Sequence, residues 1–266
     1  ILLTLLTKLS VILLIYQISK ETNIEKNYKL IFFLFTLLLI FIFTIKNITY
    51  RDLPLFIFLN LLAYVFSVNK KVLFANILIG LLSVIAFIWS IERGAYLNLS
   101  LMILLIFFLL NKNYYQFLSI LMGVIIGWII FYSIVGEKEF IEFYKNTKDI
   151  LLYIDYMHGN MHPTPFSSDE NSTRATRVLL LIVFSGTLVI YLNFFDNKKF
   201  NNKFKLFYVF LFILCATSYR NALGVSDAAH IKISAEFPEI MVISLLSNNF
   251  LHFIIRNKLL SNYINL

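Results

Sequence analysis

Charge is scarce in this sequence, and so is cysteine. Only 14% of the 266 residues are charged and 59% are hydrophobic, whereas a typical soluble domain carries about 25% charged residues. The single cysteine, Cys215, cannot form an intramolecular disulfide or a cysteine-based metal site. The Lys- and Asn-rich linkers contain no Gly-rich phosphate loop and no paired acidic motif. These absences exclude a soluble globular fold and a disulfide scaffold, and they argue against a nucleotide site in the linkers.

What the sequence has instead is a series of apolar runs, many of them near twenty residues long. A helix needs about 20 apolar residues to cross the roughly 30 Å of hydrocarbon in a bilayer. The sequence therefore predicts an all-α protein, a polytopic bundle of about nine transmembrane helices. The expected spans are 1–18, 30–45, 53–68, 72–91, 95–111, 115–135, 178–195, 206–220 and 237–255.

These runs divide the chain into three parts. Residues 1–135 are expected to form six transmembrane helices, 136–177 an extracytoplasmic loop that carries an interfacial helix, and 178–266 three further transmembrane helices. The chain starts with Ile1 and enters an apolar run directly, without the charged region of a signal peptide. We therefore expect the chain to be the C-terminal fragment of a longer protein.

The distribution of charge predicts the orientation. With the C-terminus inside, the inner loops hold twelve basic and three acidic residues, and the outer loops hold ten basic and twelve acidic ones. An excess of Lys and Arg on the cytoplasmic side is typical of bacterial inner-membrane proteins. We therefore expect a multi-pass protein of the plasma membrane, whose net charge of +8 reflects topology and not binding to nucleic acid. The most polar segments then lie on the extracytoplasmic face.

The loop 136–177 is the longest polar segment. Within it, residues 137–157 alternate apolar and charged side chains at helical spacing, which predicts an amphipathic helix in the membrane interface. Arg174 and Arg177 follow at the start of the next span, one helical turn apart. One interpretation is a lid over a lipid-facing cavity in which both arginines face a phosphate. The other is a solvated loop whose arginines snorkel to the interface.

Two histidines in the same loop, His158 and His162, are four residues apart. On a helix this spacing would place both imidazoles on one face, where they could bind a metal. Gly159 and Pro163 disfavour a continuous helix there, and Asp155 is the only candidate for a third ligand. We therefore predict no metal site.

Glu92 and Arg93 lie at an expected outer hairpin turn between two apolar helices. Two charges in this position are costly unless they reach water, pair with each other or bind a ligand. Arg93 is therefore either a snorkelling residue or an anion ligand, with Glu92 holding it or acting as a base.

The segment from Ser218 to Ser234 is the most polar connection between two expected spans. A helix is expected to end near Arg220, and Ser226 is a plausible N-cap for a short helix that begins at Asp227. Asp227 and His230 would then share a face, so that the carboxylate orients or charges the imidazole. The alternative is a loop that packs its own ion pair.

Two motifs carry a resemblance to known proteins: Ile91-Glu-Arg-Gly-Ala-Tyr-Leu-Asn98 and Arg220-Asn-Ala-Leu-Gly-Val-Ser-Asp-Ala-Ala-His-Ile231. In these motifs and in its helical architecture, the chain resembles the C-terminal half of bacterial polytopic GT-C-type glycosyltransferases and O-antigen polymerases or ligases. The resemblance implies an extracytoplasmic active site and a polyprenyl-phosphate-linked sugar donor. The acidic residue that GT-C enzymes carry in their first outer loop cannot be placed in this chain, because we expect the N-terminal part of the protein to be missing. His158 or His162 is a possible counterpart of the catalytic histidine of the ligases.

The residues and the resemblance together predict a membrane glycosyltransferase or polymerase of cell-envelope glycan synthesis. Its expected partners are membrane lipid, the lipid-linked sugar donor and a glycan acceptor, and no cofactor is identified. The alternatives are a transporter or flippase of lipid-linked glycans or small solutes, and a non-catalytic membrane subunit. The predicted catalytic residues are Asp227, His230 and Glu92, and the predicted phosphate-binding residues are Arg93, Arg220, Arg174 and Arg177.

Overall fold

The structure is a computed structural model that describes residues 1–68, 70–157, 164–168, 172–194, 200–201, 203–224 and 228–256. Within these ranges the chain is all-α, as predicted, and contains no β-strand. A 3-10 turn, η1 (Tyr50–Asp52), precedes the third helix. The helices are α1 (Leu2–Glu21), α2 (Lys26–Phe43), α3 (Leu53–Ser67), α4 (Leu73–Trp89), α5 (Ile91–Leu110), α6 (Tyr114–Val135), α7 (Glu137–Met157), α8 (Ser172–Phe194), α9 (Lys205–Gly224) and α10 (Ala228–Arg256).

The lengths of the helices identify a multi-pass membrane protein. Among the described residues, five helices are long and apolar enough to cross a bilayer: α1, α5, α6, α8 and α10. Each of the nine expected spans overlaps one helix, and the predicted amphipathic segment 137–157 is the helix α7. The remaining candidates are shorter than a full crossing, among them α4 and the apolar parts of α2 and α9.

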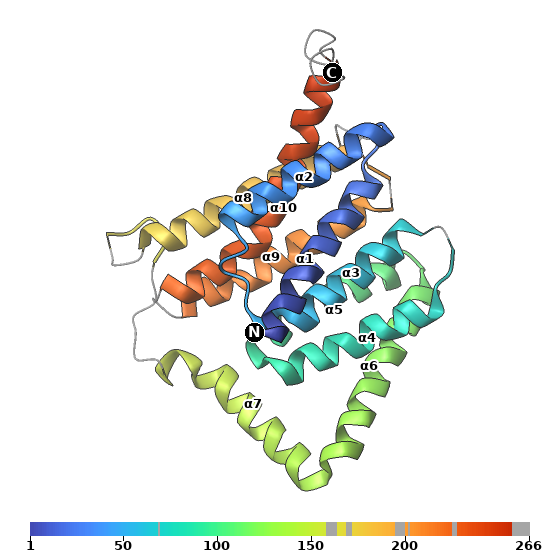
Figure 1. Ribbon diagram of the computed structural model, residues 1–266. Coiled ribbons are helices and arrows are strands. Elements are labelled where there is room, and N and C mark those ends of the chain that lie inside the picture. The colour runs from blue at the N-terminus through green and yellow to red at the C-terminus, as the bar shows by residue number, and fades with distance from the viewer. Residues whose placement is uncertain are drawn as a thin grey trace.

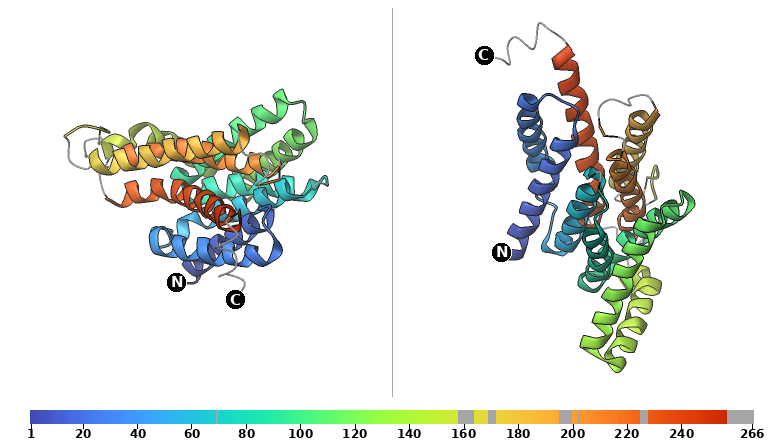
Figure 2. Two further views of the ribbon diagram at one scale, coloured as in Figure 1. Left: turned by 90° about the horizontal axis from the view of Figure 1, so that it is seen from above. Right: turned by 90° about the vertical axis from the view of Figure 1, so that its right-hand side faces the viewer.

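The helices are arranged as a packed bundle with one projecting pair. In the bundle α3 lies between α1 and α4, and α9 packs against α5, α8 and α10. Figure 1 shows α6 and α7 as a V-shaped pair beside the bundle, with the turn between them furthest from the other helices. Gly136 forms this turn with a φ of +83°, a conformation that glycine adopts without strain. The further views show the same projection (Figure 2).

A close contact between α4 and α6 joins the projecting pair to the bundle. A Cβ atom on Gly123 would lie 2.0 Å from the carbonyl oxygen of Ile77, and one on Gly80 would lie 2.1 Å from that of Ile120. Only glycine allows the two backbones to approach this closely. Small residues four apart serve the same purpose in other membrane helices.

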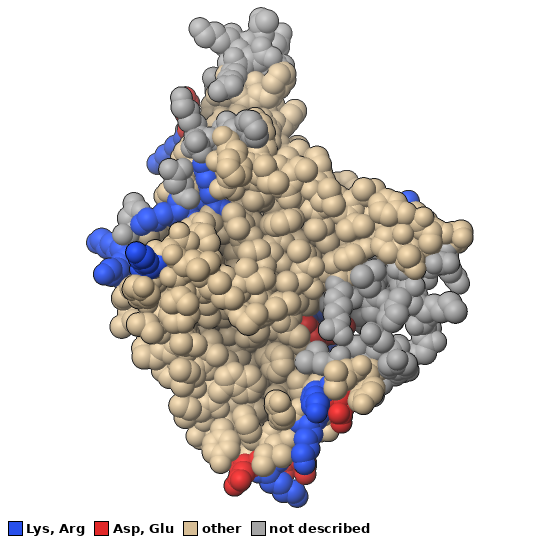
Figure 3. All heavy atoms as spheres, turned by 180° about the vertical axis from the view of Figure 1, so that it is seen from behind, with Lys and Arg blue, Asp and Glu red and all other residues tan. Residues whose placement is uncertain are grey.

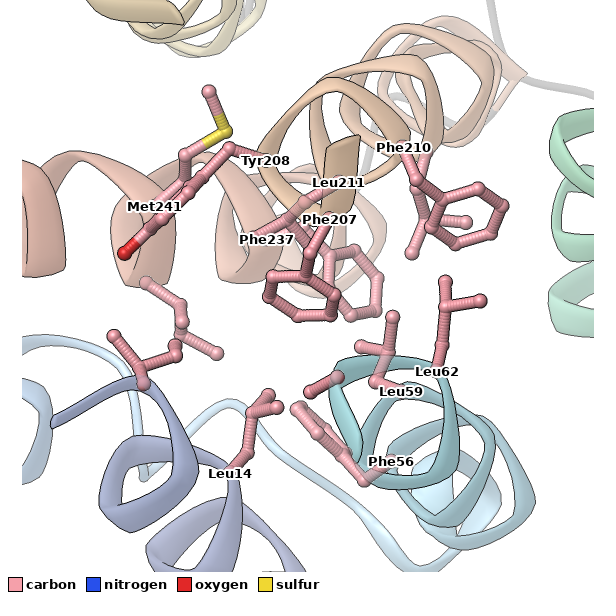
Figure 4. Close-up of a cluster of buried hydrophobic side chains, with 14 of the residues drawn as sticks. Leu14, Phe56, Leu59, Leu62, Phe207, Tyr208, Phe210, Leu211, Phe237 and Met241 are labelled. Atoms are coloured by element: carbon pink, nitrogen blue, oxygen red, sulfur yellow. The ribbon is translucent and has the colours of Figure 1, made fainter. Parts of the chain in front are cut away.

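Aromatic side chains fill the core between α3, α9 and α10. Phe210 of α9 packs on Phe58 of α3 at 5.7 Å between ring centroids, and Phe237 of α10 lies 5.9 Å from Phe56. Figure 4 shows Phe56, Leu59 and Leu62 of α3 facing α9 and α10 across this core. The packing of Phe237 fixes the position of the residue before it, Glu236, which belongs to the site described below.

Three helix ends differ from the prediction. The expected short helix from Asp227, separate from a span that starts at 237, is wrong: α10 is continuous from Ala228 through Pro238. Tertiary packing of Phe237 and Ile240, both fully buried, holds the helix together across the proline. Likewise α9 ends at Gly224 and not near Arg220, and the hairpin turn lies at Ser90, so that Glu92 and Arg93 fall in the first turn of α5.

The surface separates charge from apolar area. Figure 3 shows Lys and Arg gathered along one edge of the molecule, with a broad uncharged area between them and the mixed charges at the opposite edge. Many large apolar side chains are exposed, among them Leu38, Leu110 and Phe194. A soluble monomer exposes such large apolar areas only rarely, whereas lipid covers them in a membrane protein.

Candidate functional site

A buried ion pair joins Arg93 of α5 to Asp52 of η1. The guanidinium Nε of Arg93 contacts Oδ1 of Asp52, and the two side chains are 2% and 0% exposed. The other carboxylate oxygen of Asp52 accepts hydrogen bonds from the backbone N–H of Thr49 at 2.8 Å and from its hydroxyl at 2.9 Å. Hydrogen bonds within its own turn therefore orient the Asp52 carboxylate toward Arg93.

A second acid, Glu236 of α10, completes the cluster. It is fully buried and interacts electrostatically with both Arg93 and Asp52. Among the described residues, neither of its carboxylate oxygens has a hydrogen-bond partner, and the same is true of the buried hydroxyl of Tyr96, one turn beyond Arg93. Asp52 pairs directly with the guanidinium of Arg93, whereas Glu236 interacts with it only electrostatically. A buried polar group without a hydrogen bond costs free energy, so these groups are candidates for contact with a ligand.

The acidic side of the cluster continues along α10. Glu239, one turn after Glu236, accepts a hydrogen bond of 2.9 Å from the hydroxyl of Thr44. Thr44 follows the last residue of α2. The first half of α10 is therefore fixed to the connection between α2 and α3, which also carries Asp52.

Hydrogen bonds bring the end of α9 to the same place. The hydroxyl of Thr217 donates to the carbonyl of Tyr96 at 3.3 Å, and the hydroxyl of Ser234 donates to the carbonyl of Ser218 at 3.1 Å. The hydroxyl of Tyr219 donates to the carbonyl of Ala175 in the first turns of α8 at 3.2 Å. The starts of α5, α8 and α10, the end of α9 and η1 thus meet at one end of the bundle.

The predicted site residues fall mostly on these converging segments. Glu92 is half-buried in the first turn of α5, and Arg177 is exposed near the start of α8. Arg174 lies in α8, Arg220 in α9 and His230 in α10, but their side chains lie outside the described part of the structure. Asp227, His158 and His162 also lie outside the described residues. The catalytic and phosphate-binding roles predicted from the sequence for Glu92, Arg93, Arg174, Arg177, Arg220, Asp227 and His230 stay predictions.

An apolar groove of about 500 Å³ lies between α7 and the helices α4 and α6. The amphipathic helix α7 forms one wall with Phe140 and Phe143, and Trp128 of α6 and Phe87 of α4 form the other; Lys148 lies at its edge. The groove is linked to the charged cluster through the hairpin of α4 and α5. A Cβ on Gly94 would lie 2.1 Å from the Cα of Phe87, so the residue after Arg93 packs directly on the groove wall.

Three members of the cluster, Asp52, Tyr96 and Glu236, were not singled out from the sequence. Each lies at or near the end of an apolar run, where an isolated polar residue is typical of an interfacial anchor. A faint signal existed in the two acids, since Asp52 comes two residues before Pro54 and Glu236 two residues before Pro238. A proline close to the end of an expected span marks the helix boundary where polar side chains from different loops can meet.

Comparison with known proteins finds no matching family, curated protein or solved structure. Within the described residues, no group of three His, Cys, Asp or Glu side chains could hold a metal ion.

Proposed function

We propose that this protein is an integral membrane glycosyltransferase or polymerase that uses polyprenyl-phosphate-linked sugars at the extracytoplasmic face to build a cell-envelope glycan. The observation that carries the proposal is the buried cluster of Asp52, Arg93 and Glu236, assembled from three separate segments at one end of the bundle. Charged groups inside a membrane protein are costly, and those that persist mark functional sites.

The lipid-linked donor needs an apolar surface beside cations at headgroup depth. The groove formed by Phe140, Phe143 and Trp128 supplies the apolar surface for the polyprenyl chain. Arg177 is exposed at the start of α8, and with Arg174 and Arg220 it would neutralise the phosphate. Arg93 is already paired with Asp52, so we assign it to hold the buried carboxyl groups, and a phosphate would reach it only by displacing one of them.

The transfer itself needs a carboxylate as base. The bond between C1 of the sugar and the phosphate oxygen breaks, and its electron pair leaves with the polyprenyl phosphate. A new bond forms between C1 and the oxygen of the acceptor hydroxyl, whose proton passes to the carboxylate. Glu236 is the buried acid whose oxygens accept no hydrogen bond from the described residues. We therefore propose it for this role beside the sequence-based candidates, Glu92 and the pair Asp227 and His230.

One observation favours a transporter or flippase as the second candidate. Glu236 and Arg93 lie inside helices and not in loops, as do charged groups that line a translocation path. A flippase would move the lipid-linked sugar without breaking its C1–O bond, and a non-catalytic membrane subunit would do neither. Cleavage of that bond therefore separates the three functions.

The experiment is deletion of the gene followed by complementation. Envelope glycans from the deletion strain are separated by gel electrophoresis after complementation with wild type, Glu236→Gln or the control Glu139→Gln, which changes an exposed acid on α7. We expect long glycans with wild type and Glu139→Gln, and short glycans with Glu236→Gln at equal protein level in the membrane. Normal glycans in the deletion strain itself would contradict the proposal.

A further inference from the structure

A second cavity lies at the other end of α5 from Arg93. Its volume is about 510 Å³, and it forms where the ends of α3 and α5 meet the starts of α4, α6 and α9. The linkers that reach it carry Lys70, Lys71 and Lys112, which fall on the cytoplasmic side in the orientation expected from the charge distribution. The cavity is therefore separate from the proposed catalytic end.

The cavity is positively charged. Lys70 and Lys71 reach it from the linker between α3 and α4, and Lys203 reaches it from the segment before α9. Among the described residues that line it, none is Asp or Glu. The ammonium of Lys71 lies 5.0 Å from the ring centroid of Tyr115, a cation–π contact that holds it at the wall. Three cations with no acid among the described lining residues attract an anion.

Besides the lysines, the lining has polar groups that can form hydrogen bonds with a ligand. Asn76 is 1% exposed, and its amide nitrogen donates to the hydroxyl of Ser119 at 3.0 Å. Its carbonyl oxygen is buried and has no hydrogen-bond partner among the described residues. A buried acceptor without a donor calls for a ligand that carries a hydroxyl group. Asn111 and Gln116 add amide groups to the same wall.

An apolar part completes the lining. Val65 of α3, Phe108 of α5 and Leu206 of α9 contribute apolar side chains to the lining, on helices that also expose apolar side chains. A ligand with a phosphate at the lysines can therefore extend an alkyl chain along the helices. Basic pockets between transmembrane helices on the cytoplasmic side are a known mode of anionic lipid recognition.

We propose that this cavity binds a phosphate-bearing anion with hydroxyl groups, the chemistry that the headgroup of an anionic glycerophospholipid presents. Lys70, Lys71 and Lys203 bind the phosphate, and the carbonyl oxygen of Asn76 accepts a hydrogen bond from a headgroup hydroxyl. The site does not depend on the proposed glycosyl transfer, because it lies at the opposite end of α5.

The test is native mass spectrometry of the full chain in detergent, titrated with phosphatidylglycerol or phosphatidylcholine that carry the same acyl chains. The cavity variant is Lys70→Gln/Lys71→Gln/Lys203→Gln. The control is Lys20→Gln/Lys26→Gln/Lys29→Gln, which removes equal charge from the end of α1 and the start of α2. Since each surface lysine contributes severalfold to binding of an anionic lipid, we expect the cavity variant to bind phosphatidylglycerol on the order of 100-fold more weakly than wild type.

Two results would overturn the proposal: equal loss of phosphatidylglycerol in both triple variants, or equal affinity of wild type for the two lipids. Adding millimolar inorganic phosphate identifies the source of the anion. Displacement of phosphatidylglycerol shows a phosphate site open to soluble anions, and retention shows a site for the lipid headgroup. If the cavity variant unfolds in lipid-free detergent, the single variants Lys203→Gln and Lys26→Gln are compared instead. Each removes one charge, and weaker binding of phosphatidylglycerol is expected only for Lys203→Gln.

Discussion

Arg93 and Asp52 form an ion pair buried inside the bundle, although the whole of α3 and α4 separates them in the sequence. The pair fixes the start of α5 to the turn before α3, and it brings a cation beside Glu236 of α10. The turn η1 and the helices α5 and α10 are thereby joined. The ion pair is the structural centre of the proposed site.

Removing the cation should destabilise the fold. Arg93→Met leaves Asp52 and Glu236 buried without a counter-charge, and breaking a buried pair costs about 3–5 kcal/mol. We expect the free energy of unfolding in detergent to fall by that amount. Arg51→Met is the control, because Arg51 is an exposed arginine beside Asp52, and it should change stability by less than about 0.5 kcal/mol.

A double variant shows whether the loss arises from the uncompensated charge. Asp52→Asn with Arg93→Met removes both members of the pair, so the combined cost should be smaller than the sum of the two single costs. Simple additivity would show that the two side chains act independently, against the pairing described above.

The contact between α4 and α6 should be sensitive to one methyl group. Gly123→Ala places a Cβ against the backbone carbonyl of Ile77, which cannot move without moving α4. We expect a loss of about 1–3 kcal/mol, the usual cost of overpacking. Gly127→Ala is the matched control, because its Cβ would lie 3.0 Å from side-chain atoms of Val84, which can shift. Thermal unfolding in detergent measures both, and an equal effect at the two glycines would contradict the close backbone contact.

The groove under α7 should determine the affinity for the lipid chain of the donor. Phe143→Ala removes apolar contact area from the groove wall, so KM for a long-chain polyprenyl-phosphate-linked sugar should rise about tenfold, with kcat little changed. Phe74→Ala is the control, because Phe74 is an exposed aromatic residue at the other end of α4. If a donor with a short, water-soluble chain shows the same rise in KM, the groove does not bind the lipid chain.

Much of the helical organisation could be predicted from the sequence, because hydropathy in a membrane protein is a local property. The apolar runs and the amphipathic period of residues 137–157 identify the helices to within a few residues at most ends. The error at α10 has a tertiary cause. Glu236, Pro238 and Glu239 interrupt the apolar pattern, yet the helix continues through them because Phe237 and its neighbours pack in the core.

The site could be predicted only in part. From their polar composition, the segments that contain Glu92-Arg93 and Arg220 are expected to lie on the same face. The structure places these segments at one end of the bundle. The partnership of Arg93 with Asp52 and Glu236 could not be predicted, because it depends on which helices become neighbours. The cavity lined by Lys70, Lys71 and Lys203 could not be predicted for the same reason, because each linker alone has the composition of an ordinary connection between helices.

Release of polyprenyl phosphate by the purified protein in detergent tests the proposed function most directly, because micelles have no second leaflet to which a lipid could be flipped. Lipid-linked donors and glycan acceptors extracted from the deletion strain serve as substrates. We predict that wild type and Glu139→Gln release polyprenyl phosphate and extend the acceptor, whereas Glu236→Gln is slowed at least about 100-fold, the usual contribution of a catalytic base. Absence of release with the folded wild-type protein, or equal release with Glu236→Gln, would contradict glycosyl transfer at this site.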